Sequence, residues 1–305
     1  MLDVCLLGTG GMMPLPDRWL TALLVRYNGR MILIDCGEGT QIPVKKAEWG
    51  FKAIDAILFT HYHADHIAGL PGLLLTLGNC GRTEPLVLAG PPGLKKVVEG
   101  LTVISPELPY ELNLIELSGN EISELCIKDI FIKAMPVHHT LTCLSYCIEL
   151  KRQGKFDLQC AKNLNIPVNY WNRLQKGETI TLSDNVIKPE MVLGEPRKGI
   201  KVSYCTDTRP TDKIVEFIKD SDLFICEGMY GDENDALKAV EKRHMTFSEA
   251  GIMAKQANVN ELWLTHYSPS LTEPEEYIDM ARSSFQNSVA GTDLLTKTIK
   301  YQSDD

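Results

Sequence analysis

The 305-residue sequence lacks a long apolar run: no eighteen consecutive apolar residues occur, so we expect no membrane-spanning helix. The first residues, Met1–Leu7, lack the basic region and small-residue cleavage site of a secretory signal, so we expect no signal peptide. The nine cysteines are odd in number and include no CxxC pair. Scattered cysteines of this kind favour a cytoplasmic protein with reduced thiols over a disulfide framework.

An excess of positive charge is also missing, because the formal net charge is −9. The chain therefore has no global basic field, and a nucleic-acid partner would have to bind a local basic patch. The composition, 44% hydrophobic and 23% charged, is that of a globular protein. The candidate basic clusters are Lys45-Lys46, Lys95-Lys96, Lys151-Arg152 with Lys155, and Arg197-Lys198 with Lys201.

Strand-like apolar runs alternate with helical patterns along the chain, which predicts an α/β protein with two sheets and helices outside them. The predicted strands are Val4–Leu7, Thr21–Arg26, Met31–Ile34, Ala56–Thr60, Pro85–Leu88, Ile130–Ala134, Leu144–Leu150, Lys201–Cys205, Asp222–Cys226 and Glu261–Leu264. The predicted helices are Ile67–Leu77, Gly93–Glu99, Thr211–Lys219, Glu233–Arg243 and Phe247–Ala257. We expect a single domain over residues 1–305. Residues 152–197 are richer in Asn, Lys, Gln and Pro, and we interpret them as an inserted arm; a long loop with a hairpin is the alternative.

The most informative motif is His61-Tyr62-His63-Ala64-Asp65-His66, which directly follows an apolar strand-like segment. A rigid strand that ends in three imidazoles and a carboxylate is typical of a metal site. These donors suit Zn²⁺, and also Mn²⁺ or Fe²⁺. The alternative is a solvated histidine-rich turn.

Further candidate ligands each follow another predicted strand, namely His139, Asp207, Glu227 and His266. Loops at one edge of a sheet can converge on one point. Asp207 is the natural carboxylate to bridge two cations, with a turn-forming aspartate as the alternative. His138 and His139 are adjacent and face opposite ways on an extended chain, so only one of them is expected to be a ligand.

His244 lies just before Thr246-Phe247-Ser248-Glu249, a capping box that predicts the start of a helix. A helix N-terminus attracts phosphate, and a histidine beside it can protonate a leaving oxygen. The alternative is a surface histidine in a loop. Glu227 either orients His244 or is purely structural.

Several segments together resemble a known family. The HxHxDH motif matches the metallo-β-lactamase superfamily, and within it the chain is most similar to ribonuclease Z, the endonuclease family that trims the 3′ end of precursor tRNA. The supporting segments are Leu7–Gly11, Asp35–Gln41, Gly90–Leu94, Tyr204–Pro210, Cys226–Tyr230, His244–Thr246 and Leu264–Pro269.

The resemblance implies a metallo-β-lactamase fold, a four-layer αββα sandwich, with a centre of two divalent metal ions, usually zinc. The ligands that it implies are His61, His63 and His139 for one metal, and Asp65, His66 and His266 for the other, with Asp207 between them. His139 is preferred to His138 because the family histidine stands seven residues before a tyrosine, here Tyr146. His244 would be the catalytic histidine, with Glu227 as its partner.

The expected function is a two-metal phosphodiesterase that cleaves precursor tRNA, leaves a 3′-hydroxyl on the trimmed RNA and works as a homodimer. In this hypothesis Asp65 accepts a proton from the nucleophile. Alternatives on the same fold are a hydrolase of a small phosphodiester, an aryl sulfate or a lactone. A di-iron redox module and a non-catalytic binding protein are minor alternatives.

Three positions depart from the family pattern and bear on substrate recognition rather than on the metal ligands. Trp19 stands where the family often has asparagine, and Ser270 where it often has arginine. Val168-Asn169 lies at the arm tip in place of a Gly-Pro-rich segment.

Overall fold

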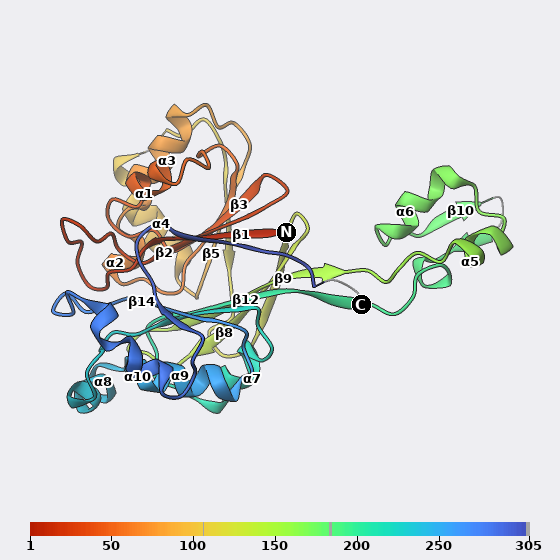
Figure 1. Cartoon of the computed structure of the whole chain (residues 1–305). Helices are drawn as coiled ribbons and strands as arrows, with labels where there is room; N and C mark the ends of the chain where they lie inside the picture. The colour runs from red at the N-terminus through yellow and green to blue at the C-terminus, as the bar shows by residue number, and fades with distance from the viewer. Residues whose placement is uncertain (106, 183–184, 303–305) are drawn as a thin grey trace. The chain divides into compact units, whose positions relative to one another are not determined.

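The structure is a computed structural model that describes residues 1–105, 107–182 and 185–302 (Figure 1). The described chain divides into two compact units. The larger unit comprises residues 1–149 and 201–300, and the smaller comprises residues 150–200 with Tyr301 and Gln302.

Within the described ranges, the larger unit contains two seven-stranded sheets. The first sheet has the order β16-β1-β2-β3-β4-β5-β6 and the second β15-β14-β13-β12-β9-β8-β7. The strands of the first are β1 Leu2–Gly8, β2 Ala22–Tyr27, β3 Arg30–Ile34, β4 Ile54–Leu58, β5 Leu86–Gly90, β6 Leu112–Glu116 and β16 Leu295–Ile299. Those of the second are β7 Ser123–Ile127, β8 Ile130–Val137, β9 Cys143–Arg152, β12 Arg197–Cys205, β13 Leu223–Glu227, β14 Leu262–Thr265 and β15 Ser288–Ala290.

Helices cover the outer face of each sheet, as Figure 1 shows. The helices of the larger unit are α1 Gln41–Lys46, α2 Ala64–Ile67, α3 Leu70–Asn79, α4 Leu94–Leu101, α7 Asp212–Ile218, α8 Ala236–Lys242, α9 Phe247–Gln256 and α10 Ile278–Arg282. The short 3₁₀ turns are η1 Thr102–Ile104, η4 Glu233–Asp235 and η5 Pro274–Tyr277. Every residue of β4, β13 and β14 is buried, as expected of inner layers covered on both faces. The predicted αββα sandwich is therefore confirmed.

All ten predicted strands are present with small shifts of their ends, but the apolar pattern missed β6, β7, β15 and β16. β6, β7 and β16 lie at sheet edges and alternate exposed with partly buried residues, so their hydrophobic signal is weak.

One helix prediction was wrong. The segment Ile67–Leu77 is not one helix, because the chain breaks at Ala68 and Gly69 between α2 and α3.

The backbone at this break packs closely, and two glycines make that possible. A Cβ on Gly69 would lie 1.9 Å from the carbonyl oxygen of Gly37, and a Cβ on Gly37 would lie 2.1 Å from that of Asp65. The Gly69 amide also donates to Cys36 O at 2.9 Å, and the Cys36 amide donates to His66 O at 2.7 Å. Two glycines therefore allow the segment after β3 to pack directly against the histidine-rich segment after β4.

The smaller unit has regular structure where the sequence showed only weak periodicity. Its elements are α5 Leu158–Asn163, η2 Val168–Tyr170, α6 Trp171–Gln175, the hairpin β10 Ile180–Leu182 with β11 Asn185–Ile187, and η3 Pro189–Met191. Its own core consists of Ala161, Ile166, Leu174, Ile180, Ile187 and Val192. α5 begins at Asp157, whose carboxylate accepts the amide hydrogens of Gln159 and Cys160. This N-cap and the small core explain why the segment folds without a long amphipathic pattern.

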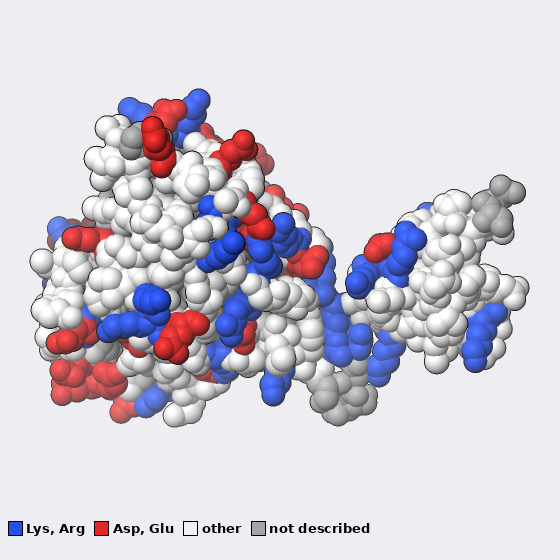
Figure 2. All heavy atoms as spheres, turned by 90° about the horizontal axis from the view of Figure 1, so that it is seen from above, with Lys and Arg blue, Asp and Glu red and all other residues white. Residues whose placement is uncertain are grey.

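The charge of this unit differs from that of the whole chain. Residues 150–200 contain nine Lys and Arg against five Asp and Glu, a net charge of +4 in a chain whose total is −9. On the face drawn in Figure 2, most charged side chains of this unit are blue. The local excess of positive charge that a polyanion would need is thus found in this segment.

The sequence predicts no membrane-spanning helix and reduced cysteines. No helix among the described residues has both the length and the apolar character needed to cross a bilayer. All nine cysteines fall within the described ranges, and each is a free thiol.

We predict that Gly69→Ala lowers the free energy of unfolding by about 2–3 kcal/mol, because the added methyl group would overlap the Gly37 carbonyl. Gly100→Ala in α4 is the matched control, since nothing lies within 4 Å of its Cβ position. The control should be neutral or stabilising by about 0.5–1 kcal/mol. Urea denaturation measures both, and equal stability of the two variants would contradict the steric account.

Candidate metal centre

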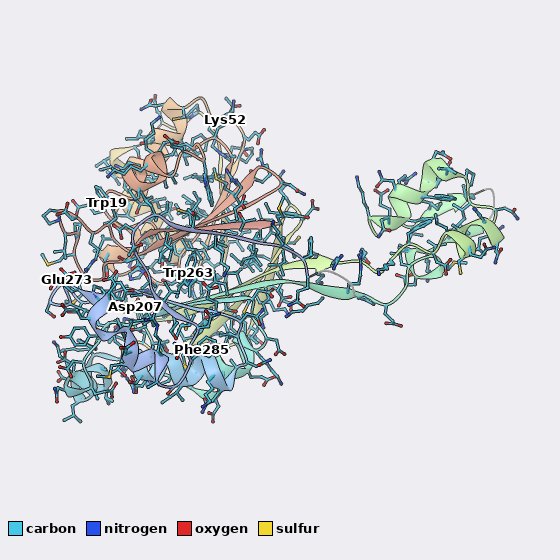
Figure 3. All side chains as sticks on the ribbon, in the orientation of Figure 1. Trp19, Lys52, Asp207, Trp263, Glu273 and Phe285 are labelled. Carbon is cyan, nitrogen blue, oxygen red and sulfur yellow. The ribbon has the colours of Figure 1, made fainter. Side chains whose placement is uncertain are left out.

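The sequence-predicted ligands come together where four strands end. The loop after β4 carries His61 and His63 and leads into α2, which carries Asp65 and His66. His139 follows β8, Asp207 follows β12 and His266 follows β14. Figure 3 labels Asp207 at this edge, where the N-terminal and C-terminal halves of the larger unit meet. His61, His66, His139, Asp207 and His266 are buried, whereas His63 and Asp65 are half-buried.

The seven residues form two groups of converging donor atoms. His61, His63, His139 and Asp207 make up one group, and Asp65, His66 and His266 the other; within each group the donor atoms lie within 4.8 Å of one another. The Asp207 carboxylate faces both groups. Its Oδ2 is 3.7 Å from the Nε2 atoms of His61 and His139, and its Oδ1 is 3.3 Å from His66 Nε2 and 3.2 Å from His266 Nε2.

The ring nitrogens approach one another closely. His63 Nδ1 lies 2.9 Å from His61 Nε2 and 3.3 Å from His139 Nε2, and the Nε2 atoms of His66 and His266 are 3.2 Å apart. Several imidazoles cannot all donate to one another at one point, so some lone pairs face each other. A shared cation relieves this repulsion, and imidazole with carboxylate is the donor set that divalent zinc, manganese and iron prefer. The residues present therefore fit a divalent metal site.

The pKa shifts of three histidines support the same interpretation. Burial, together with the charge of nearby His66, holds the pKa of His61 well below its ordinary value. Burial is also the main cause that lowers the pKa values of His63 and His139. These three imidazoles are therefore neutral near pH 7, which is the form that binds metal.

The two carboxylates remain ionised in spite of their burial. Burial raises the pKa of Asp207, but the positive charge of His266 and His66 outweighs it and places the pKa well below the usual range. Burial also raises the pKa of Asp65, and hydrogen bonds with His266 and His66 reverse the shift. The site thus holds two ionised carboxylates in a buried place, where protonated histidine or a bound cation compensates their charge.

Two residues that the sequence analysis did not assign orient the ligands. Asp35 Oδ2 accepts from His66 Nδ1 at 2.9 Å, and its Oδ1 accepts from the Thr60 amide at 2.8 Å. Thr60 Oγ1 lies 3.0 Å from His61 Nδ1. With these Nδ1 atoms engaged, the Nε2 atoms are turned toward the centre. The signal available in the sequence was the position of Asp35 directly after the strand Met31–Ile34, the same placement as the other site residues.

Strained backbone accompanies the site. Asp35, Asp207 and His266 have positive φ angles of 63°, 50° and 60°. Each such residue costs on the order of 1–3 kcal/mol and persists only where the surroundings fix it. Gly11 packs against the ring of His266, since a Cβ there would lie 2.8 Å from Cε1 of that ring.

His244 and Glu227 form a buried pair beside the two groups of candidate ligands. His244 Nδ1 lies 3.1 Å from Glu227 Oε2, which also accepts the Met245 amide at 3.1 Å, and the Thr208 amide donates to Oε1. Burial lowers the pKa of His244, but the Glu227 carboxylate outweighs this and raises it to about 9. The His244 ring centroid is 5.2 Å from that of His139.

The neighbouring backbone is fixed by Arg209, a residue of the Tyr204–Pro210 segment with no role assigned from the sequence. Its guanidinium pairs with Glu249 and donates to the carbonyl oxygen of His244. The predicted capping box of Thr246 and Glu249 is confirmed at the start of α9. His138 stands apart: its amide donates to Thr208 Oγ1, and it belongs to neither ligand group.

A cavity of about 660 Å³ opens onto the two groups. Besides ligands and His244, its lining includes Met12, Thr140, Tyr230, Lys238, Lys242, Ser268, Pro269 and Ser270. The Met12 amide donates to Asp65 Oδ2 at 2.7 Å, so the loop after β1 holds one wall of the cavity. A substrate can therefore reach both ligand groups and His244 from one opening.

Comparison with known proteins identifies the family. A family model described as anti-Pycsar protein Apyc1 matches residues 2–98, under half of the chain. Ribonuclease Z of Lachnoclostridium phytofermentans is 55% identical over 301 residues, which cover 99% of each protein. The chain belongs to the ribonuclease Z family. Membership makes it a hydrolase, a metal-dependent endoribonuclease.

Solved structures agree on the fold. Human tRNase Z, short form, matches with a TM-score of 0.67 at 24% identity, over 98% of this chain and 99% of that one. The metallo-β-lactamase fold protein YhfI from Bacillus subtilis matches with a TM-score of 0.68 at 19% identity, over 97% and 98%. The metallo-β-lactamase fold expected from the HxHxDH motif is thereby confirmed.

The adjacent histidines provide a matched test of the ligand groups. We predict that His139→Ala lowers the metal content of the purified protein, because it removes one of the four donors of the group that contains Asp207. His138→Ala should leave metal content unchanged. Mass spectrometric metal analysis of both proteins, with circular dichroism to verify folding, measures the difference; loss of metal from the His138 variant alone would reverse the assignment.

Proposed function

We propose that this ribonuclease Z family member removes the 3′ trailer of precursor tRNA and leaves a 3′-hydroxyl on the mature RNA. The observation that carries the proposal is the combination of full-length likeness to ribonuclease Z with a cluster of five histidines and two aspartates at the floor of one cavity. The substrate is larger than the cavity, so RNA must also bind outside it.

We assign His61, His63, His139 and Asp207 to one metal ion and Asp65, His66, His266 and Asp207 to the other, with zinc as the resident metal. Such a pair of bound cations supplies Lewis acidity, which makes water a stronger nucleophile at neutral pH and stabilises charge on phosphoryl oxygens. Asp207 would contribute to holding both ions, because each of its oxygens faces a different group of imidazoles.

The residues around the cluster handle the protons. Asp65 lines the cavity and accepts the proton that the attacking water loses. His244 donates a proton to the departing O3′ as the phosphorus–O3′ bond breaks and the new phosphorus–oxygen bond forms. Glu227 supports this role because it orients Nδ1 of His244 and keeps the imidazole protonated near neutral pH.

Residues 152–197 are assigned as an inserted arm that binds RNA. Support comes from the net positive charge of residues 150–200 and from their own small core, which makes them a folded unit rather than a loop. Val168 at the tip is 69% exposed and stands where the family has a Gly-Pro-rich segment.

Of the other two departures, Ser270 lines the cavity. The Trp19 amide donates to Asp293 Oδ2 at 2.6 Å, and neither residue lines the cavity. They leave the ligand set intact and bear on how the RNA is held.

We further propose that the enzyme acts in the cytoplasm as a homodimer. The free thiols suit a reducing compartment, and dimerisation follows from the family resemblance. Analytical ultracentrifugation measures the oligomeric state.

The role of His244 can be isolated with two substrates. We predict that His244→Ala reduces kcat on precursor tRNA by about 10²–10⁴-fold while metal content is unchanged. On bis-p-nitrophenyl phosphate the loss should be under tenfold, because p-nitrophenolate is a good leaving group that departs without protonation. Equal losses on both substrates would show that His244 does not act as the general acid.

The arm can be tested through its exposed lysines. We predict that the triple variant Lys162→Gln, Lys176→Gln, Lys188→Gln raises KM for precursor tRNA and leaves kcat and cleavage of bis-p-nitrophenyl phosphate unchanged, because these side chains are exposed and remote in sequence from the ligands. An unchanged KM in steady-state assays would remove these lysines from RNA binding.

A further inference from the structure

One wall of the active-site cavity is cationic. Apart from histidines, the basic side chains among the described lining residues are Lys238 and Lys242, both from α8. The other charged groups of the lining are the carboxylates of Asp65 and Asp207. A polyanionic RNA chain that enters this cavity therefore meets mobile positive charge on the α8 wall and nowhere else in the described lining.

Helix geometry places the two lysines on one face, because residues four apart lie one turn above each other. Their side chains are 49% and 57% exposed, so both ammonium groups are open to a ligand. Lys238 Nζ lies 4.9 Å from the centre of the Tyr230 ring and 4.0 Å from Asp235 Oδ1, and Lys242 Nζ lies 2.9 Å from Glu241 Oε1. These surface contacts are weak and exchange readily with a phosphate.

α8 is fixed to the catalytic centre at its C-terminal end. The His244 amide donates to Ala239 O at 2.9 Å, and Ala239 is buried against Met229 and Tyr230. Arg243, which ends the helix, donates through Nη1 to the carbonyl oxygen of His139 at 2.5 Å. The helix that carries the two lysines is thus held in a defined position relative to His139 and His244.

The direction of cleavage indicates which side of the scissile phosphate the α8 wall contacts. The leaving oxygen is O3′ of the mature RNA, so the group that protonates it lies on the mature-RNA side of the scissile phosphate. His244 is proposed as that group, and α8 leads directly into it. The α8 lysines thus belong to the helix that is joined to the group on the mature-RNA side.

We infer that Lys238 and Lys242 bind backbone phosphates of the mature tRNA immediately 5′ of the scissile bond, and that they position O3′ beside His244. The inference rests on the proposed tRNA processing function. The inference assigns RNA binding within the larger unit to two residues. These residues are neither proposed metal ligands nor part of the arm.

The test compares the double variant Lys238→Gln, Lys242→Gln with the charge-matched control Lys52→Gln, Lys255→Gln, whose exposed lysines do not line the cavity. Figure 3 labels Lys52. Each protein is assayed on two precursor tRNA transcripts, one with a single-nucleotide trailer and one with an extended trailer. The double variant Lys238→Arg, Lys242→Arg retains the charge and should behave as the unmodified enzyme.

The expected result is a rise in KM of about tenfold for the Gln double variant, by the same factor on both transcripts. In the Gln double variant, the slope of log affinity against log salt concentration should be shallower by about 0.7–0.9 for each lysine removed. Mature tRNA should inhibit this variant less strongly than it inhibits the control.

A KM penalty that grows with trailer length would overturn the assignment, because it would place the lysines on the trailer side. A penalty equal to that of the control would remove them from RNA binding altogether. Failure of the underlying function is distinguishable, since the unmodified enzyme would then cleave bis-p-nitrophenyl phosphate but neither transcript.

Discussion

The Asp207 carboxylate lies between two sets of imidazoles, with one oxygen toward each set. This carboxylate is buried, and so are four of the five surrounding histidines. In a buried place ionised carboxylates and lone pairs that face one another are unfavourable unless cations join them. The arrangement is therefore that of a centre built to hold metal, and the cavity, the His244–Glu227 pair and the cationic α8 wall are all organised around it.

The sandwich supplies the rigidity that such a centre requires. Strands β4, β8, β12 and β14 end beside one another, and their inner-layer burial fixes where each following loop begins. The strained φ angles of Asp35, Asp207 and His266 are tolerated because neighbouring packing and hydrogen bonds determine them. The paired glycines 37 and 69 allow the segment after β3 to support the histidine-rich segment directly. The donor side chains are thus positioned by packing of the backbone as much as by contacts among the donors themselves.

The fold and the convergence of the seven candidate ligands could be predicted largely from the sequence, because the candidates follow apolar strands and strand ends at one sheet edge converge. The choice between His138 and His139 could not come from alternation alone, which permits either; the structure brings His139 to the cluster. Asp35 and Arg209 were missed because their roles depend on contacts 31 and 40 residues away in the sequence. The regular structure of residues 150–200 was missed because its core is small and its elements are short. Edge strands such as β16 were missed because only one of their faces is buried.

A crystal structure of the zinc-loaded protein, with anomalous data collected at the zinc edge, would show whether these residues hold two ions. We expect two peaks about 3.5–4 Å apart, with Oδ1 and Oδ2 of Asp207 each about 2.0–2.2 Å from a different ion. A single ion that Asp207 does not contact, or a zinc-loaded crystal with no peak among these histidines, would contradict this expectation.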